Sequence, residues 1–248
     1  MGRTGRSLRA SAGQTPDAAP GGAASILSLP DVAAVGRHPA HASGGAVHPL
    51  LNAMSPFLQS VADSFTEAQN RLHALLDAVD DDTFNQKPSA KGWSAAECVV
   101  HLNKIAKGYL PVMEEAVGRG GPRGEGPYTW GFVARRFVDA VRPGSRPIPT
   151  AGAMKPPAVT GLRSDIDRER VVARFDADVE RWLALCESCG DLDLSQIKIR
   201  SPFLPLMKLP LGAFLEAMGV HAVRHVGQAE RAAGVASSAS AAVEGGVA

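Results

Sequence analysis

The sequence predicts an all-α protein, a bundle of four long helices. Apolar residues recur at helical spacing in four separate segments, and hardly any stretch alternates apolar and polar residues as a strand does. One long segment rich in glycine and proline separates the second helical segment from the third. Four helices joined by short connections and one long crossover are typical of a helical bundle.

The first two helices follow from apolar spacing and from a cap. The first is predicted to begin at Pro56, and "DDDTFNQKPSAKG" ends it. The second is predicted to begin at about Ala95, because Ser94 precedes Glu97 by three residues, which is the spacing of a capping box. The apolar positions of the first helix are Phe57, Val61, Phe65, Leu72, Leu75, Leu76 and Val79, and those of the second are Val99, Leu102, Ile105 and Leu110.

The second half of the chain contains a long insertion and the other two helices. The insertion covers about residues 118–160 and carries one short helical pattern, "YTWGFVARRFVDAV". The third helix is predicted from about Asp167 to Gly190, a residue placed to end it. "DLDLSQIKIRSPFLPLMKLP" is predicted to be extended or irregular, and the last helix begins at "LGAFLEAMG" and stops at Gly234.

The ends of the chain differ in composition from its centre. Residues 1–52 and 235–248 are rich in small residues and too poor in apolar ones to build a core, so we expect them to be disordered. The folded domain is predicted over residues 53–234. The apolar helical pattern begins abruptly at Met54, and one hypothesis is that translation starts at this residue. His38, His41 and His48 lie in the first segment, where no scaffold would fix the geometry of a metal site.

Charge and cysteine usage exclude several classes of protein. The net charge is +1, with mixed signs along the chain, which gives no electrostatic surface for nucleic acid or anionic membrane. No run of about 18 apolar residues occurs, so no membrane span is predicted. Three cysteines are too few for a disulfide framework and favour a reducing compartment, the cytoplasm.

The stretch "HAVRHVGQAE" places two histidines on one face of the last helix. His221 and His225 are four residues apart, so they lie about 40° apart around the helix axis and about 6 Å along it. Phe214 and Met218 share this face, which therefore points toward the core. Two buried imidazoles need polar partners, and a shared metal ion would satisfy both. Two packed core histidines remain the alternative at this point.

A third histidine strengthens the metal interpretation. His101 lies on the core side of the second helix, beside Leu102 and one turn before Ile105. Three neutral imidazoles from two neighbouring helices would leave a coordination position open, as in catalytic metal sites, whereas structural zinc usually has four protein ligands. Histidine suits Zn, Ni and Fe alike, so the metal's identity stays open.

Three neighbours of the histidines have more than one interpretation. Glu97 lies one turn before His101 and is either a fourth ligand, a partner of a ligand or a general base, but the capping box explains it without a metal. Gln228 could orient an imidazole, bind substrate or tie two helices together. Trp93 precedes the capping serine and is better explained as a hydrophobic staple than as a stacking platform.

Two further motifs are predicted to lie outside the site. His73 on the first helix is expected at the surface or its boundary. "CESC", from Cys186 to Cys189, lacks a second pair and falls at a helix end, so a packing role is favoured over redox chemistry or zinc binding. No G-x-S-x-G, P-loop or Rossmann pattern suggests a serine hydrolase or a nucleotide-dependent enzyme.

The residues around the histidines resemble a known family. "GWSAAECVVHL", followed about 120 residues later by "HAVRHVGQ", is similar to the DinB-like superfamily in its DinB/YfiT-type branch. The resemblance covers about residues 55–233 and implies an up-down-down-up four-helix bundle with a divalent metal on His101, His221 and His225. The long insertion and the loosely matching "SPFLPLMKLPLGAFLEAM" depart from the family pattern where a substrate pocket would be shaped.

The expected function follows from the metal and from the resemblance. A divalent ion held by three neutral histidines is a Lewis acid that activates either water, for hydrolysis, or a small thiol, for attack on an electrophile. Relatives in the family use low-molecular-weight thiols, which implies a thiol-dependent S-transferase or isomerase acting on a small molecule. A metal-dependent hydrolase is the alternative. A non-catalytic, metal-binding stress-response module, whose apolar faces form a homodimer, is the hypothesis without catalysis.

Overall fold

Four long helices form the bundle in the computed structural model, which describes residues 54–146, 149–150 and 152–235. They are α1 (Pro56–Ala78), α3 (Ala95–Gly118), α5 (Arg168–Cys189) and α6 (Leu211–Ala232). The all-α fold predicted from the sequence is confirmed. The expected N-terminal extension with its three histidines, and the expected tail beyond Val235, lie outside the described residues. No helix in the described part of the chain is both long and apolar enough to cross a membrane.

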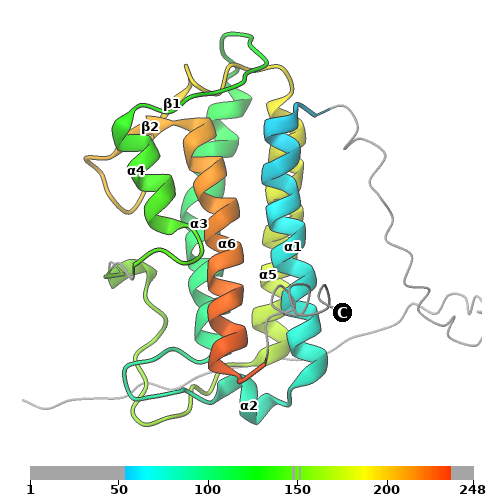
Figure 1. The fold of residues 1–248 in the computed structure, drawn as a ribbon, viewed down its shortest axis with the longest axis vertical. Coiled ribbons are helices and arrows are strands. Elements are labelled where there is room, and N and C mark those ends of the chain that lie inside the picture. Colours follow the sequence, from blue (N-terminus) through cyan, green and yellow to red (C-terminus); the bar gives the residue numbers. More distant parts are fainter. Residues whose placement is uncertain (1–53, 147–148, 151, 236–248) are drawn as a thin grey trace, which may run out of the picture. The chain divides into compact units, whose positions relative to one another are not determined.

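The four helices occupy the corners of a square. α1 and α3 each pack against both α5 and α6, so α1 and α3 face each other across the core. Figure 1 shows that α1 and α6 run in one direction and α3 and α5 in the other. Because α3 and α5 are parallel, the chain must return along the whole bundle between them, and the long insertion makes this return.

Local signals define the helix ends. Ser94 and Glu97 form both hydrogen bonds of the capping box: the Glu97 N–H donates to Ser94 Oγ over 3.1 Å, and the Ser94 N–H donates to Glu97 Oε2 over 2.8 Å. Asp167 caps α5 by accepting the Arg170 N–H. Gly190 ends α5 with a φ of +49°, a left-handed conformation that favours glycine.

Short elements that the apolar pattern did not predict complete the fold. α2 (Asp81–Asn85) follows α1, within the segment expected only to end that helix. Strands β1 (Lys198–Arg200) and β2 (Lys208–Pro210) pair antiparallel in the segment expected to be extended or irregular, with Ile199 opposite Leu209. Each strand has only three residues. Three residues are too few to show the alternation of apolar and polar positions that identifies a strand, and the prolines nearby favour an irregular segment.

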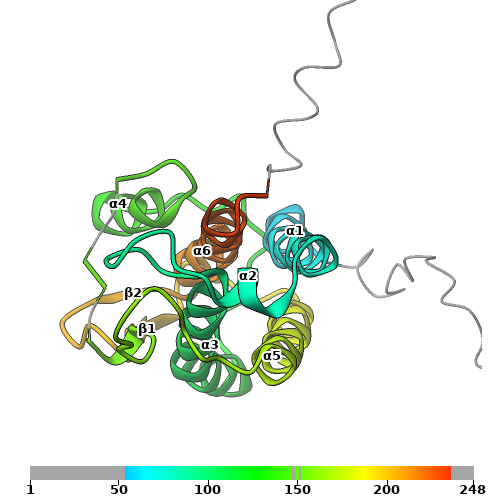
Figure 2. The ribbon, with the colours of Figure 1, turned by 90° about the horizontal axis from the view of Figure 1, so that it is seen from below.

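The insertion places two elements beside the bundle. Helix α4 (Phe132–Val141) packs against α6, and the single turn η2 (Gly152–Met154) lies against α3. Seen along the bundle in Figure 2, α4 and the β1-β2 hairpin lie outside the square, next to α6 and α3. The insertion and the hairpin therefore cover the edge of the bundle that carries all three candidate metal ligands.

The core fills the space between the four helices. Phe65 of α1 stacks on Trp182 of α5 with ring centres 5.1 Å apart and planes 8° from parallel. Leu72, Leu110 and Phe214 are fully buried in the same core. Burial of these large side chains supplies the main stabilisation of the bundle. The helix faces that carry the histidines are thereby held at fixed positions.

Candidate metal site

Three histidines converge between α3 and α6. The Nε2 atoms of His101 and His221 are 3.5 Å apart. The ring centre of His225 lies 4.5 Å from that of His101 and 4.4 Å from that of His221. One nitrogen of each ring lies within 4.8 Å of a nitrogen of both others. The structure thus brings together the three residues that the sequence singled out.

The donor set fits a divalent metal ion. Nitrogens that share one tetrahedral zinc at the usual bond length of about 2.0–2.1 Å are separated by roughly 3.3 Å, close to the spacing of the His101 and His221 nitrogens. The Nδ1 atoms of His221 and His225 are buried and have no hydrogen-bond partner among the described residues. A shared metal ion would bind one nitrogen of each ring and so give the imidazoles a partner that the protein alone does not supply; for His221 the nitrogen nearest another ring is Nε2, so its Nδ1 still needs a partner of its own.

Burial keeps the three imidazoles in the form that a metal requires. Desolvation lowers the pKa of His101, lowers that of His221 to about 3 and lowers that of His225 well below its ordinary value. Repulsion between the rings adds to the effect at His221 and His225. At neutral pH all three are uncharged, and each offers a lone pair without first losing a proton.

The insertion orients one of the candidate ligands. His101 Nδ1 lies 2.8 Å from the backbone carbonyl oxygen of Met154, in η2. A carbonyl oxygen only accepts, so Nδ1 must carry the proton, and the lone pair of Nε2 is directed to the other histidines. Sequence reasoning missed Met154, because a backbone carbonyl leaves no residue signature.

Trp93 packs on the histidines. Its ring centre lies 5.1 Å from that of His101, and 5.9 Å from that of His225 with the planes 28° apart. The sequence favoured a hydrophobic staple for this residue. The structure places its ring against two of the candidate ligands and on the wall of the adjoining cavity, contacts that a staple alone does not require. Because Trp93 directly precedes the capping Ser94, the start of α3 fixes its position.

Glu97 and Gln228 have different surroundings. The Glu97 carboxylate is buried, accepts the Ser94 N–H and lies 3.5 Å from Lys87 Nζ. The capping box and the ion pair account for the burial of the Glu97 carboxylate. Glu97 is not part of the histidine cluster. Gln228 lines the cavity, and its contact with His225 favours the protonated form of that ring.

A cavity of about 770 Å³ opens beside the three histidines, all of which line it. Val133 and Phe137 of α4 form part of its wall, and Phe203 and Met207 of the hairpin form another part. The two segments that depart from the family pattern therefore both shape the cavity. Its size is within the range of small-molecule sites, which is about 300–1,000 Å³.

Helix α4 is fixed to α6 by polar contacts at both of its ends. Arg224 Nη1 of α6 donates to the carbonyl oxygens of Ala140, over 3.0 Å, and Arg142, over 3.2 Å. Glu216 of α6 accepts the indole N–H of Trp130 over 2.5 Å and also pairs with Arg142. These contacts hold the wall of the cavity at a defined distance from the histidines.

His73 lies apart from the cluster, as predicted. Its side chain is 49% exposed, and its Nε2 is 2.9 Å from Asp176 Oδ1 of α5. This residue shares the chemistry of the three clustered histidines but none of their surroundings. It therefore provides a matched control for substitutions in the site.

The cysteines are packing residues, and their low reactivity is a testable consequence. Cys98, Cys186 and Cys189 are free and buried. Burial raises the pKa of Cys189 to about 12 and that of the other two still further. We expect a thiol reagent such as dithionitrobenzoate to label none of them in the native protein at pH 8 and all three after denaturation. Rapid labelling of Cys186 or Cys189 in the native protein would contradict the packing role of the C-x-x-C motif.

Comparison with known proteins assigns the bundle to a family. Residues 64–229, about two thirds of the chain and including all three histidines, match the family model described as the DinB superfamily. No curated protein and no solved structure matches the chain closely enough for comparison. The match spans the bundle from α1 to α6 together with the insertion. The chain belongs to the DinB superfamily.

Proposed function

We propose that the protein binds one divalent metal ion through His101, His221 and His225 and uses it in an enzymatic reaction between a small thiol and an electrophilic small molecule. The observation that carries this proposal is the cluster of three neutral imidazoles, two buried and one half-buried, on the wall of a 770 Å³ cavity. When bound, the ion would supply Lewis acidity that lowers the pKa of a neighbouring thiol or water. A site with a purely structural role would be closed by protein ligands, so the cavity favours catalysis.

The chemistry of the cavity favours a thiol over water as the nucleophile. No aspartate or glutamate is among the described residues that line it, so the wall provides no carboxylate base. A free thiol has a pKa of about 8.5 and needs little help to ionise near neutral pH, whereas water has a pKa of about 15.7. The thiol releases its proton to solvent, its sulfur forms a bond to the electrophilic carbon, and the leaving group departs with the bonding electron pair. Hydrolysis by water is the alternative.

The charges at the cavity indicate an anionic ligand with an apolar part. Its charged residues are Lys91, Arg136 and Arg224, all cationic. Lys91 and Arg136 are exposed and form no ion pair with the described residues, so both are free to meet a carboxylate or phosphate. Phe137 and Met207 offer apolar contact nearby. We propose an anionic thiol or electrophile as the occupant, and a cytoplasmic location where such thiols stay reduced.

Calorimetric titration of the zinc-loaded protein tests this function. N-acetylcysteine is the anionic thiol, N-acetylserine its oxygen counterpart and cysteamine a cationic thiol. Measuring each heat in two buffers of different ionisation enthalpy gives the number of protons released. At pH 7 we expect N-acetylcysteine to bind with release of about one proton, because it binds as the thiolate. N-acetylserine should release none, and cysteamine should bind more weakly because it meets cations.

Two comparisons decide the result. The same titration of the His225→Ala variant should show no proton-coupled binding, while the His73→Ala variant should behave as the parent does. Equal proton release with N-acetylcysteine and N-acetylserine, or none with either, would overturn the thiol proposal. Zinc-dependent cleavage of an anionic ester in that case would support the hydrolase instead.

A further inference from the structure

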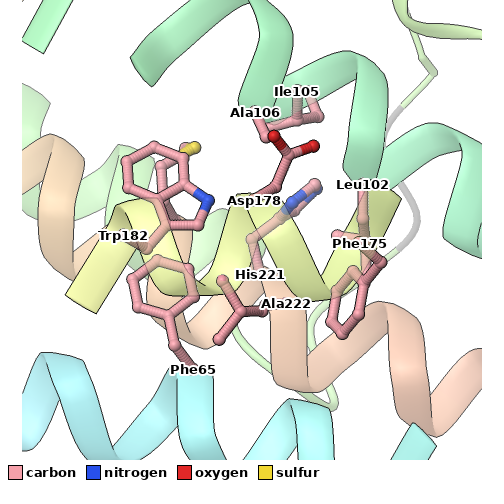
Figure 3. Close-up of a pocket in the computed structure, with 11 residues that line it drawn as sticks. Phe65, Leu102, Ile105, Ala106, Phe175, Asp178, Trp182, His221 and Ala222 are labelled. Atoms are coloured by element: carbon pink, nitrogen blue, oxygen red, sulfur yellow. The ribbon is translucent and has the colours of Figure 1, made fainter. Parts of the chain in front are cut away.

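A second, much smaller cavity lies inside the bundle. Its volume is about 20 Å³, and residues of all four long helices line it. Nine of these residues are hydrophobic, and the two others are Asp178 of α5 and His221 of α6 (Figure 3). A cavity of about 10–15 Å³ by the same measure is enough for one water molecule. This space therefore has the size for a single water beside two polar side chains.

Each of these two side chains has a buried atom that lacks a hydrogen bond. Asp178 is 2% exposed, and its Oδ2 accepts from Arg174 Nε over 2.9 Å. Its Oδ1 lies 2.8 Å from Arg174 Nη2 in an ion pair but receives no hydrogen bond, and His221 Nδ1 also has no partner. A buried nitrogen without a partner costs free energy, and the Asp178 Oδ1 beside the same cavity, although ion-paired, can still accept a hydrogen bond.

The donor and acceptor roles of the two atoms are complementary. The Nε2 of His221 faces the Nε2 of His101, on the side where the three histidines meet. If Nε2 keeps its lone pair for a metal, the proton of the neutral ring must be on Nδ1, which becomes a donor. The Asp178 carboxylate is an acceptor. A water molecule between them would accept from Nδ1–H and donate to Oδ1.

We propose that Asp178 is a positioning residue for His221, acting through one water molecule in this cavity. The water and the carboxylate hold the proton on His221 Nδ1 and thereby direct Nε2 toward the metal ion; the inference rests on the proposed metal site. Helix α5, which contributes no candidate ligand, thus takes part in forming the site. His101 receives the equivalent support from the Met154 carbonyl in the insertion.

Charged contacts hold the Asp178 carboxylate at the cavity. Arg174 and Arg181 both lie on its own helix, and Arg181 is 3.8 Å from Oδ1. Arg181 also donates to Glu114 of α3 over 2.8 Å and 3.1 Å. These pairs restrain the carboxylate but leave Oδ1 available toward the cavity. These ion pairs also stabilise the packing of α5 without any role at the metal, so the test must separate the two roles.

Three variants separate a positioning role from a structural one. Asp178→Leu keeps the branching of the side chain, although leucine is larger, and removes the acceptor, whereas Asp178→Asn keeps an acceptor oxygen at the same place. Arg174→Gln weakens the ion pair and leaves the carboxylate intact. We expect zinc affinity, measured by competition with a chelator, to fall about 10-fold to 100-fold in Asp178→Leu. Asp178→Asn and Arg174→Gln should stay within a few-fold of the parent.

The protonation of His221 gives a second readout, which a structural role would not change. Nitrogen NMR of the metal-free protein distinguishes the Nδ1–H form from the Nε2–H form. We expect the Nδ1–H form in the parent and a mixture in Asp178→Leu. An unchanged tautomer in Asp178→Leu, or a high-resolution crystal structure with no water in the cavity, would overturn the inference.

Failure of the proposed function gives a different pattern. If the parent protein binds no zinc, the metal site is wrong, and the tautomer and the crystal structure still decide the role of Asp178. If the parent binds zinc and Asp178→Leu binds it equally tightly, the metal site stands and the positioning role is wrong. Asp178→Asn provides the comparison if Asp178→Leu fails to fold.

Discussion

Replacing His225 with alanine is expected to reduce the metal content of the purified protein from about one equivalent to none. His225 is one of only three candidate ligands in the cluster, and its ring lies against both others. With one imidazole lost, two nitrogens remain, and no carboxylate or thiol among the described residues is in the cluster to replace it. A site of two neutral ligands would not retain a divalent ion through purification.

Elemental analysis of parent and variant, both prepared without a metal-affinity tag, measures this effect. The His73→Ala variant is the control, because it removes an imidazole that is 49% exposed and pairs with Asp176 outside the cluster. It should keep the parental metal content. Circular dichroism should show the same helix content in all three proteins. Equal metal in the parent and in His225→Ala would show that His225 is a core residue and not a ligand.

The fold could be predicted where its signals are local in the sequence. Ser94 with Glu97, Asp167 and Gly190 each act within a few residues, and all four lie at helix ends in the structure. Helix α2 and the hairpin were missed for the opposite reason. Five residues in α2 and three in each strand are too few to establish a period, and these elements form because the bundle covers one of their sides.

The three histidines could be predicted because, in a helix, the spacing of residues along the sequence determines which face of the helix they lie on. His221 and His225 share a face at any position along a helix, and His101 lies on the apolar side of its own helix. Met154 and Trp93 could not be assigned in this way. Their contacts with the histidines depend on where the insertion and the start of α3 lie in space, which sequence spacing does not determine.

The cavity could be located from the sequence only in outline. The insertion and the segment before α6 were expected near a pocket, because the resemblance to the family implies that a substrate pocket is shaped there. Their actual positions depend on long-range pairs such as Arg224 with the Ala140 carbonyl and Glu216 with Trp130, which join residues more than 80 apart in the chain. Single-sequence reasoning has no means of pairing such residues.

Acid is expected to destabilise the metal-free protein well above the range in which carboxylates titrate. Burial lowers the pKa of His221 in the folded state to about 3, against about 6.5 for an unperturbed histidine. The unfolded chain therefore binds more protons than the folded one at all pH values between these two, and the free energy of unfolding falls as the pH falls. Above pH 6.5 the His221 ring is neutral in both the folded and the unfolded state, so it causes no loss of stability there. Between pH 7.5 and pH 5, His221 alone accounts for roughly 2 kcal/mol.

The neighbouring titratable groups determine the sign and size of the total change in the free energy of unfolding. Burial also lowers the pKa of His225 and His101, and the cations Arg224 and Lys104 act in the same direction, so these rings add to the loss. Asp178 acts oppositely, because burial raises its pKa and the folded state then binds the extra proton. Two or three histidines outweigh one carboxyl group, so the net effect is a loss of stability.

Urea unfolding of the metal-free protein at pH 7.5, 6.5, 5.5 and 5.0 measures this loss directly. The double variant His221→Gln/His225→Gln has no proton to bind at these positions, so its stability should change much less over the same range. The His73→Gln variant, altered outside the cluster, should follow the parent. A parental stability that stays constant down to pH 5 would mean that the imidazoles already gain protons in the folded state and have more contact with solvent than the structure shows. A fall that is steep in the parent and absent in the double variant would establish that the rings of His221 and His225 are held neutral, the state in which they can bind a metal ion.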